Sequence, residues 1–163
     1  MVRAKHLLAA PLAVGLALLF ALPGCRPKPG ERCTGDRAAC VDESSALFCI
    51  DDKYVSVACR GPKGCQDGTV KVQCEQTVSE VGEVCIGTGA ACSVDHRSFL
   101  TCKAHEFALK SWCKGPKGCF QDGTDIHCDE SEADPGDPCP GRGAACSLDH
   151  ATFLECEKGK YTP

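Results

Sequence analysis

The sequence predicts a small disulfide-rich all-β fold, built as tandem modules of short antiparallel hairpins with little helix. Cysteine supplies 16 of the 163 residues, a share that marks a disulfide scaffold. The cysteines recur in a repeated pattern, with short β-branched and aromatic runs between them. A unit of about 45 residues buries too little apolar surface to fold by its core alone, so we expect disulfides to replace much of the hydrophobic interior.

The first 24 residues have the parts of a secretory signal peptide. Arg3 and Lys5 form a basic head, and residues 7–22 form an uncharged run rich in Leu and Ala, which ends shortly before Cys25. This run has 16 residues, whereas a membrane-spanning helix needs roughly 20. The pattern therefore favours a signal peptide at 1–24 over a permanent membrane anchor.

The four residues Leu22-Pro23-Gly24-Cys25 resemble the lipobox of bacterial lipoproteins. In that family a Leu stands three positions before an invariant cysteine, and Pro23 departs from the Ala or Ser that is usual there. The resemblance implies cleavage before Cys25, a diacylglyceryl thioether on its sulfur and a third acyl chain on its amino group. Two or three acyl chains hold a protein stably on a membrane. The alternative is an ordinary signal peptide followed by a structural cysteine.

Residues 25–32 are expected to be the lipidated cysteine and a stiff, Pro-rich spacer. The resemblance implies a lipid-anchored protein on the extracytoplasmic side of the bacterial cell envelope, whose membrane partner is reached through Cys25. Arg26 is not the Asp that retains some lipoproteins at the inner membrane, which favours the outer membrane.

Three stretches that begin at Gly30, Gly82 and Gly136 share one pattern. Each has Gly, an acidic residue, any residue and Cys, then Ala-Ala-Cys, an Asp and a third Cys. The first two continue with Gly-Pro-Lys-Gly-Cys and a sixth Cys, and such recurrence indicates tandem modules. We expect full modules at 33–74 and 85–128, a partial module at 139–163, and acidic, mobile linkers at 75–84 and 129–138.

Twelve cysteines are expected to form disulfides within the two full modules, each typically adding about 2–4 kcal/mol. Six cysteines can pair in about 15 ways, and the sequence does not choose among them. In the partial module Cys139, Cys146 and Cys156 can close one bridge and leave one thiol. The favoured explanation is a chain that continues; pairing with another molecule or with an unmodified Cys25 is the alternative. The twelve are Cys33, Cys40, Cys49, Cys59, Cys65, Cys74, Cys85, Cys92, Cys102, Cys113, Cys119 and Cys128.

Each module is expected to contain a β-hairpin between its third and fourth cysteine positions. Polar residues 51–53 suit the first turn, and the second hairpin has a longer tip around residues 103–106. In the third, Lys158-Gly159 suits a tight turn because Gly adopts positive φ at no steric cost.

The Gly-Pro-Lys-Gly segments at 61–64 and 115–118 are expected to be β-turns, with Pro preset at the second position. A short further strand follows each of them, at 69–74 and 124–128.

The patterns that mark catalytic or metal sites are mostly missing. The closest cysteines have five residues between them, which fits neither a zinc finger nor a Cys-x-x-Cys redox motif. The Ser-x-Asp-His motifs at 93–96 and 147–150 are interpreted as capped turns or short helical starts rather than triads. His96 and His150 are interpreted as surface residues. We expect no enzyme activity, no catalytic residue, no metal and no cofactor.

The Gly-Pro-Lys-Gly loops are the candidate binding surface. Cations beside an aromatic ring suit an anionic glycan or an acidic patch on an extracellular protein, although the same residues also suit solvated turns. No nucleic acid is expected, because the chain has a net charge of −4 and phosphate binding needs a cationic footprint. The candidates are Arg60, Lys63, Trp112, Lys114 and Lys117.

The sequence thus predicts a non-enzymatic, membrane-anchored lipoprotein whose disulfide-stapled modules serve binding or adhesion. The alternative is a protease-inhibitor-like scaffold, in which the loop of Lys63 or Lys117 enters the protease.

Overall fold

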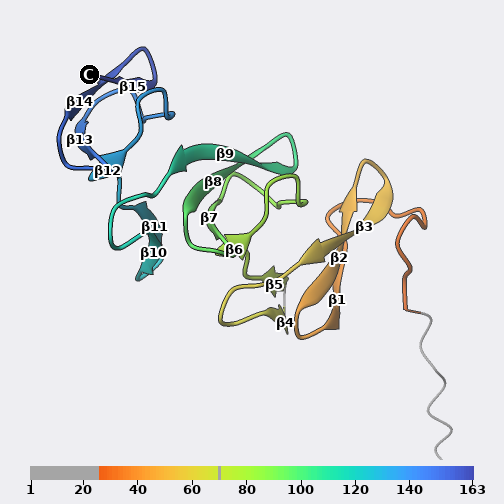
Figure 1. Cartoon of the computed structure of the whole chain (residues 1–163). Helices are drawn as coiled ribbons and strands as arrows, with labels where there is room; N and C mark the ends of the chain where they lie inside the picture. The colour runs from red at the N-terminus through yellow and green to blue at the C-terminus, as the bar shows by residue number, and fades with distance from the viewer. Residues whose placement is uncertain (1–25, 70) are drawn as a thin grey trace, which may run out of the picture.

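The structure, a computed structural model, describes residues 26–69 and 71–163, and every regular element in them is a β-strand (Figure 1). The predicted signal peptide and Cys25 lie outside the described residues. Within the described ranges, no helix is long and apolar enough to cross a membrane. The strands are β1 (Ala38–Asp42), β2 (Ser45–Ile50), β3 (Lys53–Ala58), β4 (Cys65–Asp67), β5 (Val72–Cys74), β6 (Val78–Ser79), β7 (Ala90–Ser93), β8 (Ser98–Lys103), β9 (Glu106–Trp112), β10 (Cys119–Asp122), β11 (Asp125–Cys128), β12 (Glu132–Ala133), β13 (Ala144–Ser147), β14 (Phe153–Glu157) and β15 (Lys160–Thr162).

The strands form small sheets that follow one another along the chain (Figure 1). The first module has the sheet β1-β2-β3 and the pair β4-β5, and the second has β6-β7-β8-β9 and the pair β10-β11. The third has β12-β13-β14-β15. We call the larger sheet of each module its sheet half and the two-stranded pair its ribbon. The predicted fold class, small, disulfide-rich and all-β, is confirmed.

Seven disulfides hold these sheets, and both full modules use the same connectivity. The first cysteine pairs with the third inside the sheet half, while the second pairs with the fifth and the fourth with the sixth to attach the ribbon. The third module closes the first-to-third bridge, and Cys146 is an exposed free thiol. The pairs are Cys33–Cys49, Cys40–Cys65, Cys59–Cys74, Cys85–Cys102, Cys92–Cys119, Cys113–Cys128 and Cys139–Cys156.

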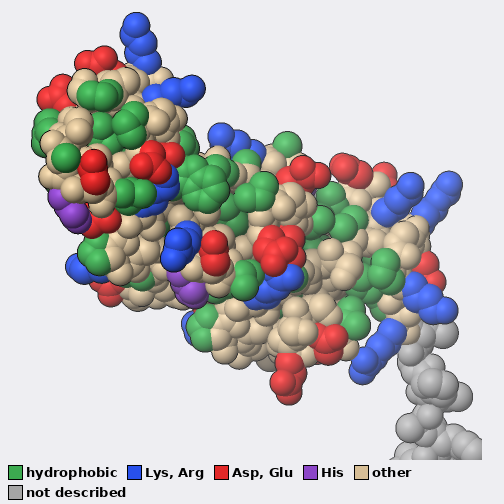
Figure 2. All heavy atoms as spheres, in the orientation of Figure 1, with side chains coloured by type: hydrophobic (Ala, Val, Ile, Leu, Met, Phe, Trp, Pro, Cys, Tyr) green, Lys and Arg blue, Asp and Glu red, His purple; other side chains and the backbone are tan. Residues whose placement is uncertain are grey.

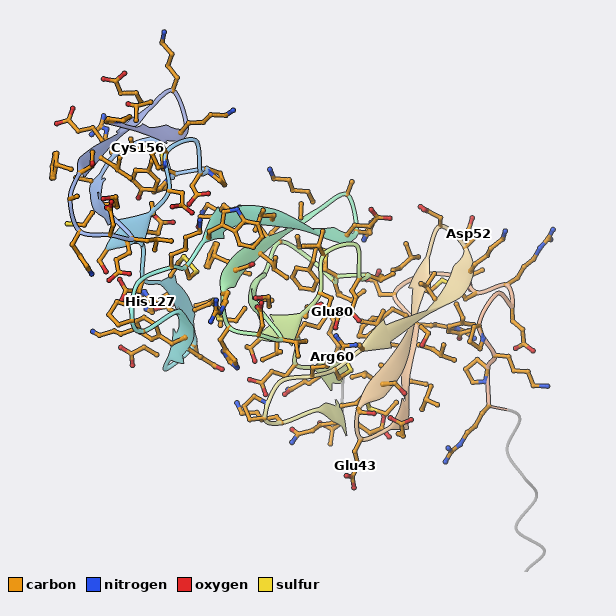
Figure 3. All side chains as sticks on the ribbon, viewed as in Figure 1. Glu43, Asp52, Arg60, Glu80, His127 and Cys156 are labelled. Carbon is orange, nitrogen blue, oxygen red and sulfur yellow. A yellow bond between two sulfur atoms is a disulfide. The ribbon has the colours of Figure 1, made fainter. Side chains whose placement is uncertain are left out.

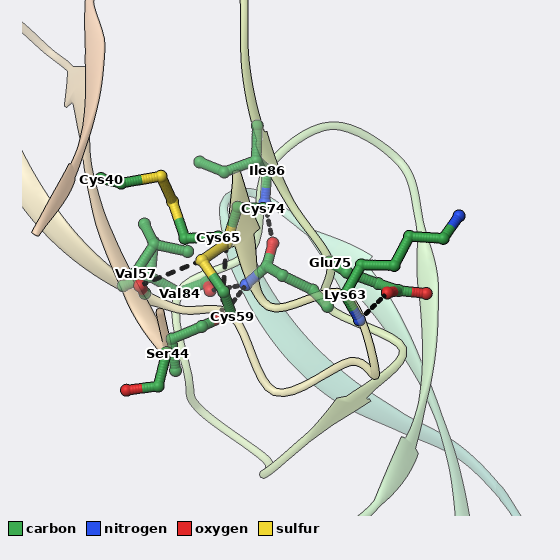
Figure 4. The surroundings of a disulfide bond; sticks show 12 residues. Cys40, Ser44, Val57, Cys59, Lys63, Cys65, Cys74, Glu75, Val84 and Ile86 are labelled. Atoms are coloured by element: carbon green, nitrogen blue, oxygen red, sulfur yellow. Dashed lines mark hydrogen bonds between the residues drawn. A yellow bond between two sulfur atoms is a disulfide. The ribbon is translucent and has the colours of Figure 1, made fainter. Parts of the chain in front are cut away.

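This number of disulfides indicates an oxidising compartment. The chain is a disulfide-rich scaffold of the extracytoplasmic type. The bridges that attach the ribbon of the first module, one of them Cys40–Cys65, are visible in Figure 4.

The predicted hairpins are present, and each turns through two residues with positive φ. Two successive positive φ angles mark a type I′ turn, whose twist matches that of the strands. The longer tip expected at residues 103–106 is wrong, because Lys103 pairs directly with Glu106 and leaves two residues between them. The turn residues are Asp51-Asp52, Ala104-His105 and Lys158-Gly159.

The two acidic linkers are not mobile tethers, so this expectation is wrong. Strand β6 pairs in parallel with β7, and β12 pairs with β13. The N–H of Cys92 donates to the carbonyl of Thr77, and that of Cys146 to Ser131, both at 2.9 Å. The linkers are ordered because pairing with a sheet edge satisfies their backbone groups. The modules therefore form a row of docked units (Figure 1).

Each sheet half closes over one buried leucine, Leu47, Leu100 or Leu154. Leu100 packs with Phe107 in the second module, and Leu154 packs with Tyr161 in the third. A separate cluster joins the sheet half of the second module to its ribbon, and sulfur supplies much of it. Its members are Cys92, Cys113, Cys119, Phe99, Ile126 and Cys128.

Candidate functional site

The Gly-Pro-Lys-Gly turns lead from each sheet half into its ribbon, and both are closed β-turns as predicted. In each, the N–H of the second glycine donates to the carbonyl of the first at 2.9 Å. An acid caps each turn: the N–H of Lys63 donates to Glu75 at 2.7 Å (Figure 4), and that of Lys117 to Asp129 at 3.1 Å. Hydrogen bonds from the Ser131 hydroxyl and from the Lys117 N–H lower the pKa of Asp129, so this cap is ionised at neutral pH.

Gly118 lets the ribbon of the second module approach the sheet half closely. Its φ is 62°, a conformation that strains other residues. A Cβ there would also strike the carbonyl oxygen of His96, and this same oxygen accepts the N–H of Cys119 at 2.7 Å. The Gly-Pro-Lys-Gly turn is therefore held against the turn that precedes β8.

The Ser-x-Asp-His motif in front of β8 is a capped turn, as predicted. The Ser93 hydroxyl donates to Asp95. This bond and the N–H of Arg97 lower the pKa of Asp95. His96 contacts the carbonyl oxygen of Cys119 through Nδ1 at 3.0 Å. A catalytic triad needs a serine bonded to the histidine, whereas this serine bonds the aspartate and serves as a cap.

Arg60 and Lys114, two of the predicted binding residues, join neighbouring modules instead. Arg60, labelled in Figure 3, contacts Glu83 through two nitrogens at 2.8 and 2.7 Å. Lys114 Nζ lies 2.6 Å from Asp134 and 2.7 Å from Asp137. Glu83 and Asp137 both stand two residues before the first cysteine of the next module, so the same junction occurs twice.

The charge of Lys114 is compensated at the junction between the second and third modules. Burial by itself would lower the pKa of Lys114, but hydrogen bonds to Asp134 and Asp137 outweigh this effect and raise it. Lys114 therefore stays protonated, and two carboxylates already compensate its charge. It stabilises the contact between modules more than it attracts an external anion.

A groove of about 870 Å³ lies at the junction between the second and third modules. Trp112 and Leu148 supply its apolar surface, and they are 38% and 46% exposed. His96, Arg97 and Lys117 also line it. The volume is in the range of small-molecule sites. Figure 2 shows hydrophobic side chains as separate patches among charged ones on the viewed face of the molecule.

The acids that line this groove are already bonded within the protein. Asp95 accepts the Ser93 hydroxyl, and Asp134 pairs with Lys114. In the described part of the chain, neither Arg97 nor Lys117 forms an ion pair. Among the side chains that line the groove, the cations Arg97, Lys114 and Lys117 outnumber the carboxylates Asp95 and Asp134 by one, although the chain as a whole is acidic.

The first junction has the same framework with different side chains. The N–H of Cys59 donates to the carbonyl of Ser44 as that of Cys113 does to Arg97, so Ser44 and Arg97 are equivalent. The second junction thus has an indole, an imidazole and a guanidinium where the first has a methyl, a carboxylate and a hydroxyl. By the same register, the other equivalent pairs are Ala58 with Trp112 and Glu43 with His96.

The structure brings three of the five predicted binding residues, Trp112, Lys114 and Lys117, to one groove. Arg60 lies at the first junction, and Lys63 is exposed on its turn. Both turn lysines lie in closed β-turns, whereas a protease-inhibitor loop must be extended to enter the protease. The turns therefore give the inhibitor alternative no geometric support.

Sequence reasoning did not assign His96, Arg97 and Leu148 to a binding surface. The signal was present, because they stand in the repeated turns that carry Asp and His. Only the fold shows that these turns face the Gly-Pro-Lys-Gly loop. His150 is not among the residues that line the groove, and its Nε2 lies 3.7 Å from Glu132.

Comparisons of the chain with models of protein families, with curated proteins and with solved structures find no match. A proposal about function therefore rests on the groove and on its difference from the first junction. The three features that bear on a ligand are an exposed indole, unpaired cations and acids that are already bonded.

Proposed function

We propose that this chain is a non-enzymatic, lipid-anchored protein of the bacterial cell envelope, whose groove at the second junction binds an anionic carbohydrate. The observation that carries the proposal is that the exposed ring of Trp112 lines one groove together with Arg97 and Lys117, cations that form no ion pair in the described part of the chain. The equivalent first junction, with Ala58 and Ser44 in place of Trp112 and Arg97, lacks this combination.

The lipid anchor rests on the residues at 22–25, which resemble a lipobox. The seven disulfides support an extracytoplasmic location. An acyl anchor on Cys25 leaves the modules free to present their surface, because the modules then need no membrane-binding face of their own.

An acidic sugar matches the groove better than a purely apolar ligand. The apolar face of a pyranose ring stacks on the flat indole of Trp112. Carboxylate groups at the rim of the sugar accept charge-assisted hydrogen bonds from Arg97 and Lys117. Asp134 is paired with Lys114, and the side chains that line the groove carry one more positive than negative charge, which favours such a ligand.

The groove can be tested by titrating the membrane-extracted protein with oligouronates while recording intrinsic fluorescence. Trp112 is the single tryptophan of the chain, so its emission reports on the groove alone. We expect saturable quenching or a blue shift, and about a tenfold weaker Kd for Arg97→Ser, which corresponds to about 1.4 kcal/mol.

Arg97→Ser introduces the residue of the first module, which folds with Ser at this place, so a loss of binding is not a loss of folding. Lys63→Ala is the matched control and should bind like the wild type. Wild-type emission unchanged by neutral and acidic saccharides alike, or equal affinity for Arg97→Ser, would contradict the proposal.

The anchor is tested by intact mass spectrometry of the membrane-extracted protein, with and without reduction. We expect a mature chain that begins at Cys25 and carries acyl groups, together with release of Cys25→Ser from the membrane fraction. An unacylated Cys25 in the membrane-extracted protein would rule the anchor out.

A further inference from the structure

The ribbon of the second module carries an aromatic pair on one face. Phe120 of β10 and His127 of β11 stand directly opposite each other. Their ring centroids are 5.5 Å apart with an interplanar angle of 28°. His127 is exposed and Phe120 half-buried. Figure 3 labels His127 on this ribbon.

Lys117 connects this pair to the groove. It lines the groove, and its Nζ also lies 5.9 Å from the centroid of the Phe120 ring. His96, on the groove wall, contacts the carbonyl oxygen of Cys119, the residue next to Phe120. The groove and the ribbon face therefore meet at Lys117.

The ribbon of the first module lacks this surface. Cys65 pairs with Cys74 as Cys119 pairs with Cys128, which makes the two ribbons superimposable in register. The positions of the aromatic pair are then occupied by Gln66 and Gln73. The second module thus differs from the first on the ribbon as well as at the junction, and both differences add aromatic surface beside an unpaired cation.

We infer that Phe120 and His127 form a second subsite, so that the ligand is an acidic oligosaccharide extending from the groove onto the ribbon. This inference rests on the proposed function. Trp112 and the aromatic pair are two stacking platforms, and Lys117 both lines the groove of the first and lies near the ring of Phe120 in the second. An ammonium at that place pairs with a carboxylate of the sugar chain between the two stacked units. A short saccharide occupies the groove only, and a longer chain reaches both platforms.

The test is a series of oligouronates from disaccharide to hexasaccharide, titrated against the full chain by calorimetry and by Trp112 fluorescence. The wild-type protein is expected to bind the hexasaccharide at least tenfold more tightly than the disaccharide. The variant Phe120→Gln/His127→Gln should lose this gain and keep the affinity for the disaccharide. Its new residues are those of the first ribbon, so the ribbon is expected to fold, and the Cys113–Cys128 bridge can be checked by peptide mapping.

Four results overturn the inference. Equal affinity of the wild type for short and long chains, or an unchanged gain in the glutamine variant, removes the second subsite and leaves the groove. Binding of polyglutamate as tight as that of the hexasaccharide identifies an acidic polypeptide as the ligand. Absence of binding at every length overturns the proposed function itself.

Discussion

The second and third modules contain the same sheet half, but only the second carries a ribbon in the described chain. Both sheet halves are four-stranded, with the order β6-β7-β8-β9 in one and β12-β13-β14-β15 in the other. Equivalent backbone bonds recur, from Gly82 to Phe107 and from Gly136 to Tyr161, both at 2.8 Å. One bridge closes each sheet half, Cys85–Cys102 or Cys139–Cys156.

The difference appears on the face that the ribbon covers. Cys92 is buried and bridged in the second module, whereas Cys146 is an exposed thiol. Phe99 packs in the cluster between sheet and ribbon, whereas Phe153 is 62% exposed. The backbone pattern of the sheet half thus recurs in both modules, and in the second module the ribbon is an added layer that brings its own core and supplies the Gly-Pro-Lys-Gly side of the groove.

The largest expected effect comes from removing the bridge of each sheet half. Cys139→Ala/Cys156→Ala should cost the third module about 3 kcal/mol and unfold it, since this is its one bridge in the described chain. Cys85→Ala/Cys102→Ala opens a loop of the same length, 17 residues, but two bridges remain in that module. Hydrogen exchange of β14 reports on the stability of the third module, and that of β8 on the second. Equal protection of β14 and β8 in their respective variants would contradict the idea that the ribbon adds stability to the second module.

An intermediate loss of stability is expected when the equivalent phenylalanines, Phe99 and Phe153, are replaced. Phe99→Ala should destabilise the second module by about 2 kcal/mol, because Phe99 packs against the buried cysteine cluster and lies under Lys110 Nζ, 4.9 Å from its ring centroid. Phe153→Ala should change stability by less than about 0.5 kcal/mol. Denaturant unfolding followed by hydrogen exchange separates the modules, and similar losses at the two positions would show that the ribbon adds no core.

The smallest expected effect is a dependence of stability on pH, which the second and third modules share. The Ser93 hydroxyl lowers the pKa of Asp95, and that of Ser147 lowers the pKa of Asp149, each helped by a backbone N–H. Near and below the ordinary aspartate pKa of 3.8, the unfolded state binds more protons than the folded state. The stability that these two aspartates contribute is therefore present above that pH and is lost as the pH falls through their pKa in the folded state.

Both modules should therefore lose protection from hydrogen exchange between about pH 4 and pH 2. Asp95→Asn should flatten this dependence in the second module only, and Asp149→Asn in the third only. A third module insensitive to acid would show that the capped turn depends on the ribbon after all.

The repeat, the hairpins and the closed Gly-Pro-Lys-Gly turns could be predicted from the sequence because each depends on neighbouring residues. Pro62 and Pro116 preset the turn backbone, and Lys158-Gly159 marks a tight hairpin. The sequence does not predict the two-residue turn at Ala104-His105, since Ala is not typical of positive φ. The order of the linkers could not be predicted from the sequence, because an acidic composition indicates exposure to solvent. In the structure, Glu83 and Asp137 have partners in the preceding module.

The sequence by itself determined a cysteine-rich β scaffold in tandem modules, because cysteine spacing and turn residues are local features of the chain. Tertiary structure alone decided the pairing of the cysteines, the docking of each module on the next and the existence of the groove. These depend on which backbone groups approach each other across long separations, as the Cys119 N–H does on the His96 carbonyl. Two junctions built on one framework therefore differ in chemistry through Trp112 and the neighbours His96 and Arg97, which only the fold brings to one groove.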